Sequence, residues 1–327
     1  MSFNNHLRAL FALLIAGVLA FGVAACGDDE EDSGGDSGGD TSSNLIESNP
    51  DNEGIELTIG SKNFDEQFIL GEIYAQALEA AGYTIETDLN LGSEVIAKKA
   101  LENGDVDAYP EYTSTTLSSL YGVPPEEIPG DATEAYDLAV ENLEGDGLTA
   151  FPPTEFTSAN GVGLLTETAE DLGVETISDL EGVSQDLELF GTSECRQRAD
   201  CLVGLEDSYG LEFAGFTPVD PELRYEVLDK GDADLSILFT TDGQLFTSDD
   251  YTLLEDDQQL LPSGYVIFTA SQEAVDEAGS GFQETVELVQ GELTLEVMQE
   301  LNSRVSLDRE DPADVAADYL QAAGYTE

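Results

Sequence analysis

Apolar residues along this chain recur first with a period of two and then with the spacing of a helix. Residues 55–59 alternate between apolar and polar side chains, which predicts a strand. Apolar residues then fall on one face of a helix over 65–81, and Gly82 is placed to end it. Further along, the pattern predicts a strand at 83–91, a helix at 94–103 and a strand at 106–109. The last strand is expected to stop at Pro110, which lacks the N–H group that a central strand uses.

Strands that alternate with helices indicate an α/β fold with a mostly parallel sheet, and part of this pattern occurs twice. Residues 100–107 are echoed by residues 227–234. A strand followed by Gly60-Ser61 is echoed by a strand followed by Gly191-Thr192. Two echoes in the same order predict two similar lobes. Free N–H groups at such strand–helix junctions favour anions, and junctions that face each other line a cleft, so we expect a small ligand to bind between the lobes.

The amino-terminal stretch indicates where the protein works. A short basic start, an apolar run over residues 9–23 and small residues before Cys26 predict a secretory signal peptide at residues 1–25. The end of this stretch resembles a bacterial lipobox, which implies cleavage before Cys26 and lipid on its thiol and new amino end. A plain signal peptide and a weak anchor helix are the alternatives.

Residues 26–53 consist largely of Gly, Ser, Asp and Glu, so they cannot bury a core and predict a disordered acidic tether. With a lipid on Cys26, this tether would hold an exported protein at the outer face of the cytoplasmic membrane.

The charge of the chain excludes several classes of partner. It has 70 acidic residues and only 10 basic ones, for a formal net charge of −60. Such a surface repels phosphate, which argues against binding to nucleic acid or to anionic lipid headgroups. At 41% hydrophobic residues, the chain can still build a core of one large or two medium domains.

The other two cysteines, Cys195 and Cys201, predict a disulfide because bridges persist in exported proteins. Two reduced thiols are the alternative. The single histidine, His6, lies in the signal peptide, so we expect neither a zinc site nor a histidine-based catalytic site in the mature chain.

Several motifs together resemble the osmoprotectant (glycine betaine, carnitine, choline) substrate-binding proteins of ABC transporters. The first reads Gly60-Ser61-Lys62-Asn63-Phe64, and another reads Tyr109-Pro110-Glu111-Tyr112-Thr113. Further matching segments are 78–83, 191–198, 209–213, 254–257 and 298–302. The resemblance extends from about residue 55 to residue 327.

The resemblance implies an α/β fold of two lobes, the type II periplasmic-binding-protein architecture, with the ligand cleft between them. The chain of this family crosses twice between its lobes. This implies that lobe one comprises residues 54–155 and 260–327, and that lobe two comprises residues 156–259.

The resemblance also implies an aromatic cage for a quaternary ammonium group. Tyr112 stands at one cage position of the family, and Phe239 stands where the family has a second tyrosine. Asn160 and Gly264 occupy the positions of two further tyrosines. Cations are attracted to aromatic faces, so a cage with fewer rings should bind such a group more weakly. Core packing is the alternative role for the two aromatic residues.

Polar residues are implied for the other end of the ligand. Lys62 and Arg198 match family positions that hold a carboxylate, with Ser61 and Thr115 as hydrogen-bond donors. Glu194 is expected either to orient Arg198 or to meet the cation. A surface ion pair is the alternative for Arg198.

These observations predict a solute-binding component of an ABC importer that performs no chemistry and needs no cofactor. Its predicted ligand is glycine betaine or a related quaternary-ammonium osmoprotectant, and its predicted partner is a permease driven by a cytoplasmic ATPase. The depleted cage leaves an alternative, in which the same scaffold binds a different small zwitterion such as an amino acid.

Overall fold

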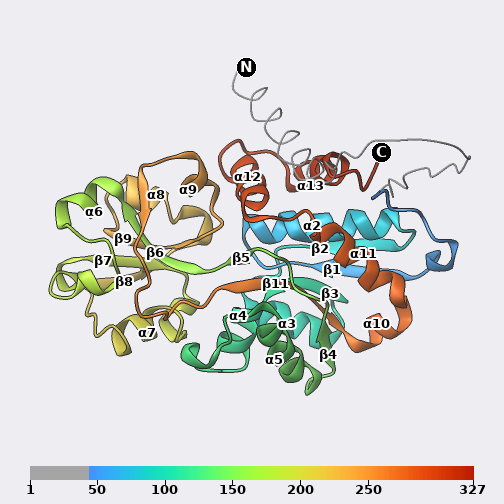
Figure 1. The fold of residues 1–327 in the computed structure, drawn as a ribbon, viewed down its shortest axis with the longest axis horizontal. Coiled ribbons are helices and arrows are strands. Elements are labelled where there is room, and N and C mark those ends of the chain that lie inside the picture. The colour runs from blue at the N-terminus through green and yellow to red at the C-terminus, as the bar shows by residue number, and fades with distance from the viewer. Residues whose placement is uncertain (1–43) are drawn as a thin grey trace, which may run out of the picture.

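The computed structural model describes residues 44–327, which form two lobes joined side by side (Figure 1). The expected signal peptide, the lipid site at Cys26 and most of the expected tether lie outside the described residues. Within the described part, no helix is both long and apolar enough to span a membrane.

Lobe one is built on a mixed sheet with the strand order β2-β1-β3-β11-β4, in which β5 also pairs with β11. The strands β2 and β3 run parallel to β1, whereas β11 runs antiparallel to its neighbours. The strands are β1 (Glu56–Gly60), β2 (Thr84–Asp88), β3 (Ala108–Tyr112), β4 (Leu148–Ala150), β5 (Thr157–Ser158) and β11 (Gly264–Ser271).

Helices cover both faces of this sheet (Figure 1). One group surrounds α2, whose buried Tyr74 packs against Phe268 of β11 with 4.5 Å between ring centroids. It comprises α2 (Asp65–Ala80), α10 (Gln272–Ala278), α11 (Ser280–Gln290), α12 (Leu295–Ser306) and α13 (Pro312–Ala322). The opposite group comprises α3 (Glu94–Asn103), α4 (Thr113–Thr115), the π-helical turn Thr116–Leu120 and α5 (Ala132–Glu144).

Short polar signals set the ends of these helices. Gly104, at φ 74°, ends α3 in the left-handed conformation that glycine adopts without strain. Asp131 begins α5 because its carboxylate accepts hydrogen bonds from the N–H groups of Thr133 and Glu134.

Lobe two is built on a second sheet with the order β10-β6-β9-β7-β8. Its strands are β6 (Asn160–Leu165), β7 (Glu188–Gly191), β8 (Gly215–Pro218), β9 (Leu235–Phe239) and β10 (Tyr251–Leu253). Its helices are α6 (Thr166–Leu172), α7 (Leu202–Asp207), α8 (Glu226–Asp229) and α9 (Gly243–Thr247). The core of this lobe is separate from that of lobe one and also takes in Leu260 and Leu261.

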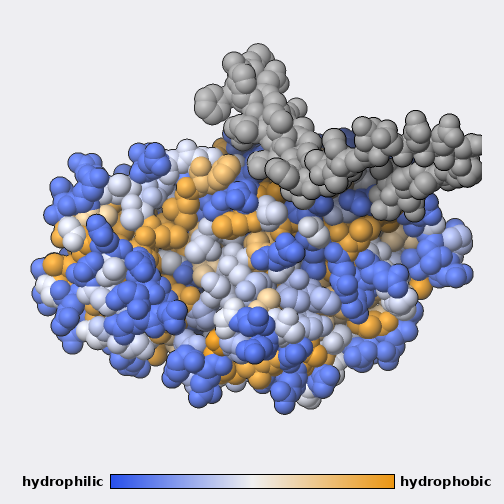
Figure 2. Space-filling view, viewed as in Figure 1, coloured by the Kyte–Doolittle hydropathy of each residue, from blue (hydrophilic) through white to orange (hydrophobic). Residues whose placement is uncertain are grey.

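The chain passes between the lobes at Ala159 and again between β10 and β11. Beside these crossings, α9 of lobe two packs on α12 of lobe one. The contact is so close that a Cβ on Gly243 would lie 2.4 Å from the Cα of Ser303, so only glycine fits there. Polar residues cover much of both lobes on the face shown in Figure 2, with hydrophobic patches between them.

Two sequence expectations need correction. The strand β3 runs through Pro110 instead of stopping there. On one side, Pro110 pairs with Phe268 of β11, whose carbonyl accepts a hydrogen bond from the Phe151 N–H instead. On the other side, β1 pairs with β3 only at Ala108. No hydrogen bond between the strands therefore requires the N–H that proline lacks.

The second correction concerns the tether, which was expected to run to residue 53. The Ile46 N–H donates a hydrogen bond to the carbonyl of Tyr325 over 2.9 Å. The buried Asn52 amide donates to the carbonyl of Ala81 over 2.8 Å. Residues 46–52 therefore belong to the folded lobe.

Candidate functional site

A cavity of about 180 Å³ lies between the two lobes, where strands of both sheets end. Lobe one contributes the loop after β1, the start of α3 and the end of β3. Lobe two contributes the start of β6, the loop after β7 and the end of β9. This is the place where two facing α/β lobes bind small ligands.

Aromatic rings form one side of the cavity. Tyr112 ends β3, Phe239 ends β9, and Phe64 precedes the first residue of α2. The ring of Phe64 is stacked on Tyr112 with 6.4 Å between centroids, and it lies 5.3 Å from the ring of Phe239. The site therefore has three neighbouring rings, one more than the sequence assigned. The signal for Phe64 was present, because it is an aromatic residue at the strand–helix junction that carries Lys62.

Lys62 is buried next to these rings. Its ammonium lies 4.4 Å from the ring centroid of Tyr112 and 5.7 Å from that of Phe64. It also forms an ion pair with the buried carboxylate of Glu111, which accepts a 2.8 Å hydrogen bond from the Tyr112 N–H. Burial raises the pKa of Glu111, and the lysine opposes this without cancelling it. The charge of Lys62 is therefore already balanced within the protein.

A second buried carboxylate, that of Glu66, lies behind the Tyr112 ring. The phenol O–H donates to one oxygen of Glu66 over 2.6 Å, and the Asn302 amide donates to the other over 2.8 Å. The same Asn302 amide donates to the carbonyl of Thr241 in lobe two over 2.8 Å. Burial raises the pKa of Glu66, while the hydrogen bonds from Thr241, Tyr112 and Asn302 lower it by less.

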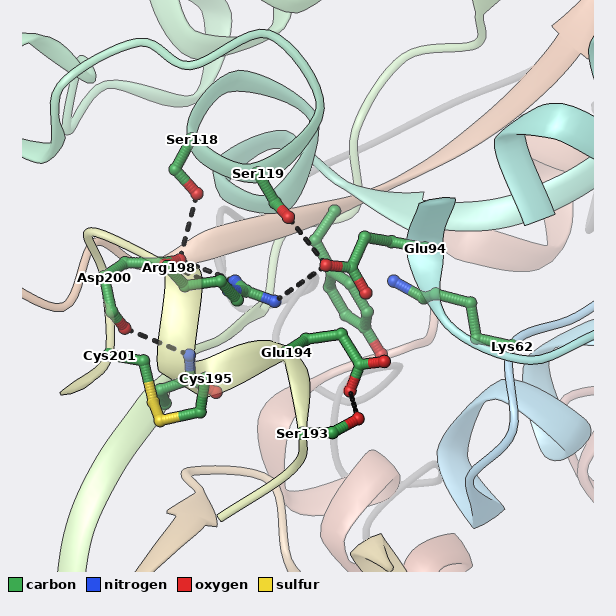
Figure 3. A network of polar contacts seen from close by, with 12 residues as sticks. Lys62, Glu94, Ser118, Ser119, Ser193, Glu194, Cys195, Arg198, Asp200 and Cys201 are labelled. Atoms are coloured by element: carbon green, nitrogen blue, oxygen red, sulfur yellow. Dashed lines mark hydrogen bonds and ion pairs between the residues drawn. A yellow bond between two sulfur atoms is a disulfide. The ribbon is translucent and has the colours of Figure 1, made fainter. Parts of the chain in front are cut away.

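Arg198 lies at the centre of a polar network that crosses the cleft (Figure 3). Its guanidinium donates two hydrogen bonds to Asp200, at 2.8 and 2.6 Å, and its Nη1 lies 3.6 Å from a carboxylate oxygen of Glu94 in lobe one. From lobe one, Ser118 donates to Asp200 over 3.0 Å and Ser119 donates to Glu94 over 2.6 Å. Burial acts to raise the pKa of Asp200, but the charge and hydrogen bonds of Arg198 together with the Ser118 hydrogen bond outweigh it and hold that pKa below its usual value.

The expected disulfide between Cys195 and Cys201 is present, and it closes the loop that carries Arg198 and Asp200. The bridge restricts the conformations of this loop and so helps to fix the guanidinium. Sequence reasoning missed Asp200, although it follows the candidate arginine by two residues inside the bridged segment.

A second arginine, Arg224, supports the cage from lobe two. Its guanidinium lies 4.5 Å from the ring centroid of Phe239 and forms a two-point ion pair with Asp242. Asp242 also accepts hydrogen bonds from the Tyr225 hydroxyl and the Phe239 N–H, at 2.8 and 2.9 Å. These bonds hold the end of β9 and therefore the Phe239 ring. No motif in the sequence pointed to Arg224.

The structure brings most of the expected binding residues together. Of the expected ligand-binding residues, those that line the cavity are Lys62, Tyr112, Thr115, Asn160, Glu194, Arg198 and Phe239. Ser61 does not line it, contrary to expectation, because its fully buried hydroxyl donates to the carbonyl of Lys62 and accepts from the Asn90 N–H. Glu194 accepts from Ser193 and, among residues 44–327, forms no ion pair with Arg198.

The two positions at which the family has further cage tyrosines differ in whether they face the cavity. Asn160 faces the cavity, and its amide donates to the carbonyl of Asp200 over 3.3 Å. Gly264 is closed off, since a Cβ there would lie 2.3 Å from the hydroxyl of Ser114 and 2.9 Å from the Cβ of Tyr112. The glycine thus permits close packing at the base of the cage.

Comparisons with known proteins agree with this architecture. Residues 55–322 match the family described as the substrate binding domain of ABC-type glycine betaine transport systems. A glycine-betaine-binding protein of Pseudomonas aeruginosa is 33% identical over 278 residues, covering 81% of this chain and 87% of that protein. The carnitine transport binding protein OpuCC of Listeria monocytogenes is 28% identical, covering 83% of this chain and 88% of that protein.

Among solved structures, the crystal structure of a glycine betaine/carnitine/choline ABC transporter protein superposes with a TM-score of 0.63. It is 26% identical and covers 81% of this chain and 97% of that one. The expected two-lobed type II periplasmic-binding fold is thereby confirmed. Proteins of this family are extracytoplasmic binding components of transporters rather than enzymes. On the match to residues 55–322 and the 33% identity to a full-length relative, the chain belongs to the family of substrate-binding domains of ABC-type glycine betaine transport systems.

Proposed function

We propose that this protein captures glycine betaine, or a closely related quaternary-ammonium osmoprotectant, and delivers it to an ABC permease with a cytoplasmic ATPase. The observation that carries the proposal is the group of three rings, Phe64, Tyr112 and Phe239, beside a cleft whose other wall carries Arg198. In this proposal the protein works outside the cell, held to the membrane by lipid on Cys26.

The two ends of the cavity suit the two ends of a betaine. Trimethylammonium has no N–H to donate, so aromatic faces recognise it through cation–π attraction and apolar contact, roughly 0.5–2 kcal/mol per ring. Tyr112 and Phe239 flank this group, and Phe64 supplies a third face. The ligand carboxylate meets Arg198 and Lys62, with Thr115 as a donor, while Asn160 lies beside Phe239 at the cage. Glu194 lies near the cation rather than orienting the arginine.

The third ring also bears on the choice of ligand. The case for an amino acid rested on the loss of tyrosines from the cage, and Phe64 makes up part of that loss. A primary ammonium group would need oxygen acceptors where these rings lie, so the geometry favours a methylated cation.

Calorimetric titration of the purified protein with glycine betaine, choline, carnitine and proline betaine tests the proposal directly. We expect micromolar binding of at least one of them, and more than a tenfold loss of affinity in Tyr112→Ala because one face of the cage is removed. Tyr265→Ala serves as the control, since this tyrosine donates to the carbonyl of Gly130 and does not line the cavity. Unchanged binding in Tyr112→Ala would reject the cage assignment.

Rebuilding the cage should succeed at one position and fail at the other. Asn160 pairs with Phe239 across neighbouring strands, so Asn160→Tyr places a ring next to Phe239. We expect glycine betaine to bind about three- to tenfold more tightly. Gly264→Tyr should give no gain and should lower the thermal midpoint, because its Cβ overlaps Ser114. Tighter binding in the Gly264 variant would contradict this geometry.

A further inference from the structure

The lysine and the arginines that line the cleft each pair with an acid, and a further buried acid, Glu94, shares Arg198 with Asp200. Lys62 pairs with Glu111, Arg198 with Asp200 and Arg224 with Asp242. The carboxylate of Glu66 is also buried, with 4% of the residue exposed, yet no lysine or arginine of residues 44–327 lies within 4 Å of it. A buried acid without a counter-charge is unfavourable, so its position next to the ligand site needs an explanation.

The hydrogen bonds of Glu66 favour its ionised form. One oxygen accepts from the Tyr112 hydroxyl at 2.6 Å and the other accepts from the Asn302 amide at 2.8 Å. Both donors are neutral, so they stabilise a carboxylate without cancelling its charge. Burial and the charge of Asp242 oppose these bonds and raise the pKa of Glu66, whereas a ligand cation in front of the Tyr112 ring favours the ionised form. In that form the negative charge lies one hydrogen bond behind a ring that faces the cavity.

The same bonds connect the two halves of the cage. Asn302 donates both to Glu66 and to the carbonyl of Thr241, which lies in lobe two just after Phe239. A phenol that donates to a carboxylate is held in one orientation and carries more electron density on its ring. Both effects strengthen attraction for a cation in front of that ring.

We propose that Glu66 is a positioning and specificity-determining residue, whose buried negative charge behind Tyr112 makes the cage select a cationic headgroup over a neutral one of the same shape. The inference rests on the proposed function and deepens it, because the ligand's own cation is then the counter-charge that Glu66 lacks. If Glu66 served only to stabilise the fold, its replacement would change the affinities for a cationic and a neutral headgroup of the same shape equally.

Two ligands of the same shape separate these roles. Glycine betaine carries a trimethylammonium group, and 3,3-dimethylbutyrate has a neutral carbon in place of that nitrogen. In Glu66→Gln, we expect glycine betaine to bind at least about tenfold more weakly, since attraction between charges is large in a dry site. Affinity for 3,3-dimethylbutyrate should stay the same or rise. Glu79→Gln is the matched control, because it removes one exposed charge from the same helix and should leave both affinities unchanged.

Equal losses for the two ligands, or no loss for glycine betaine, would overturn the inference. If neither protein binds 3,3-dimethylbutyrate measurably, Glu66→Asp decides, because aspartate keeps the charge and shortens the side chain whereas glutamine keeps the shape. Tighter glycine betaine binding by the aspartate variant supports the role of charge, and tighter or equal binding by the glutamine variant rejects it. A wild-type protein that binds none of the betaines instead refutes the proposed function, and this inference with it.

Discussion

Replacing Arg198 with alanine is expected to weaken glycine betaine binding by at least about a hundredfold. The change removes the cation proposed to meet the ligand carboxylate. It also leaves Asp200 and Glu94 facing each other across the cleft without the charge that separates them, so the lobes repel where they should close. Calorimetry gives the affinity, and a thermal unfolding scan without ligand shows whether the cleft network also stabilises the fold.

Arg196→Ala provides the matched control for that experiment. This arginine lies in the same bridged loop but points outward, where its guanidinium donates to the carbonyl of Phe216 and lies 5.2 Å from that ring. Its loss should leave affinity nearly unchanged. Wild-type affinity in Arg198→Ala would mean that the ligand carboxylate is held elsewhere and that the arginine serves only to join the lobes.

The sequence was informative where local chemistry decides the structure. Periodicity and the glycines that end helices placed the first elements close to their observed bounds, and the pair Cys195 and Cys201 predicted the bridge that is present. The echo of 100–107 in 227–234 indicated two lobes because each copy precedes a strand that ends at the cleft.

The pairing register of the strands and the contacts between distant segments could not be predicted from local sequence patterns. Pro110 was expected to stop a central strand, but whether a proline is tolerated depends on which neighbour its missing N–H would face, and sequence spacing does not determine this. The burial of Asn52 likewise depends on a carbonyl at Ala81 that comes close only after the lobe has folded.

The charge partners at the site were the least predictable feature. With 70 acidic residues in the chain, the sequence offers many candidate partners for each of its few cations. Lys62 and Arg198 line the cavity, but nothing in the sequence identified Glu111 and Asp200 as the acids that pair with them. A ligand must therefore compete with these acids or share the cation with them.

Replacing Lys62 with methionine is expected to lower the free energy of unfolding by roughly 3–5 kcal/mol, because Glu111 is then a buried acid without its cation. Both side chains are at most 5% exposed, so solvent does not screen the loss. Burial already raises the pKa of Glu111, and the loss of Lys62 raises it further. The folded state then binds a proton more readily than the unfolded state, so the variant should be least stable above the raised pKa and recover as the pH falls toward 4.5.

A second substitution, at Glu111, tests whether the loss of stability in Lys62→Met comes from breaking the Lys62–Glu111 ion pair. Glu111→Gln keeps an oxygen to accept the Tyr112 N–H but carries no charge, so Lys62→Met combined with Glu111→Gln should be more stable than Lys62→Met alone. The double variant should also lose the pH dependence that Lys62→Met adds to the wild-type profile. Lys230→Met is the control, because this exposed lysine pairs with Glu226 at the surface and its removal should have no measurable effect. Denaturant unfolding at pH 5 and pH 8 measures all four proteins against wild type. A double variant as unstable as Lys62→Met would show that the lysine stabilises the fold through packing, since only an uncompensated charge on Glu111 is relieved by the second change.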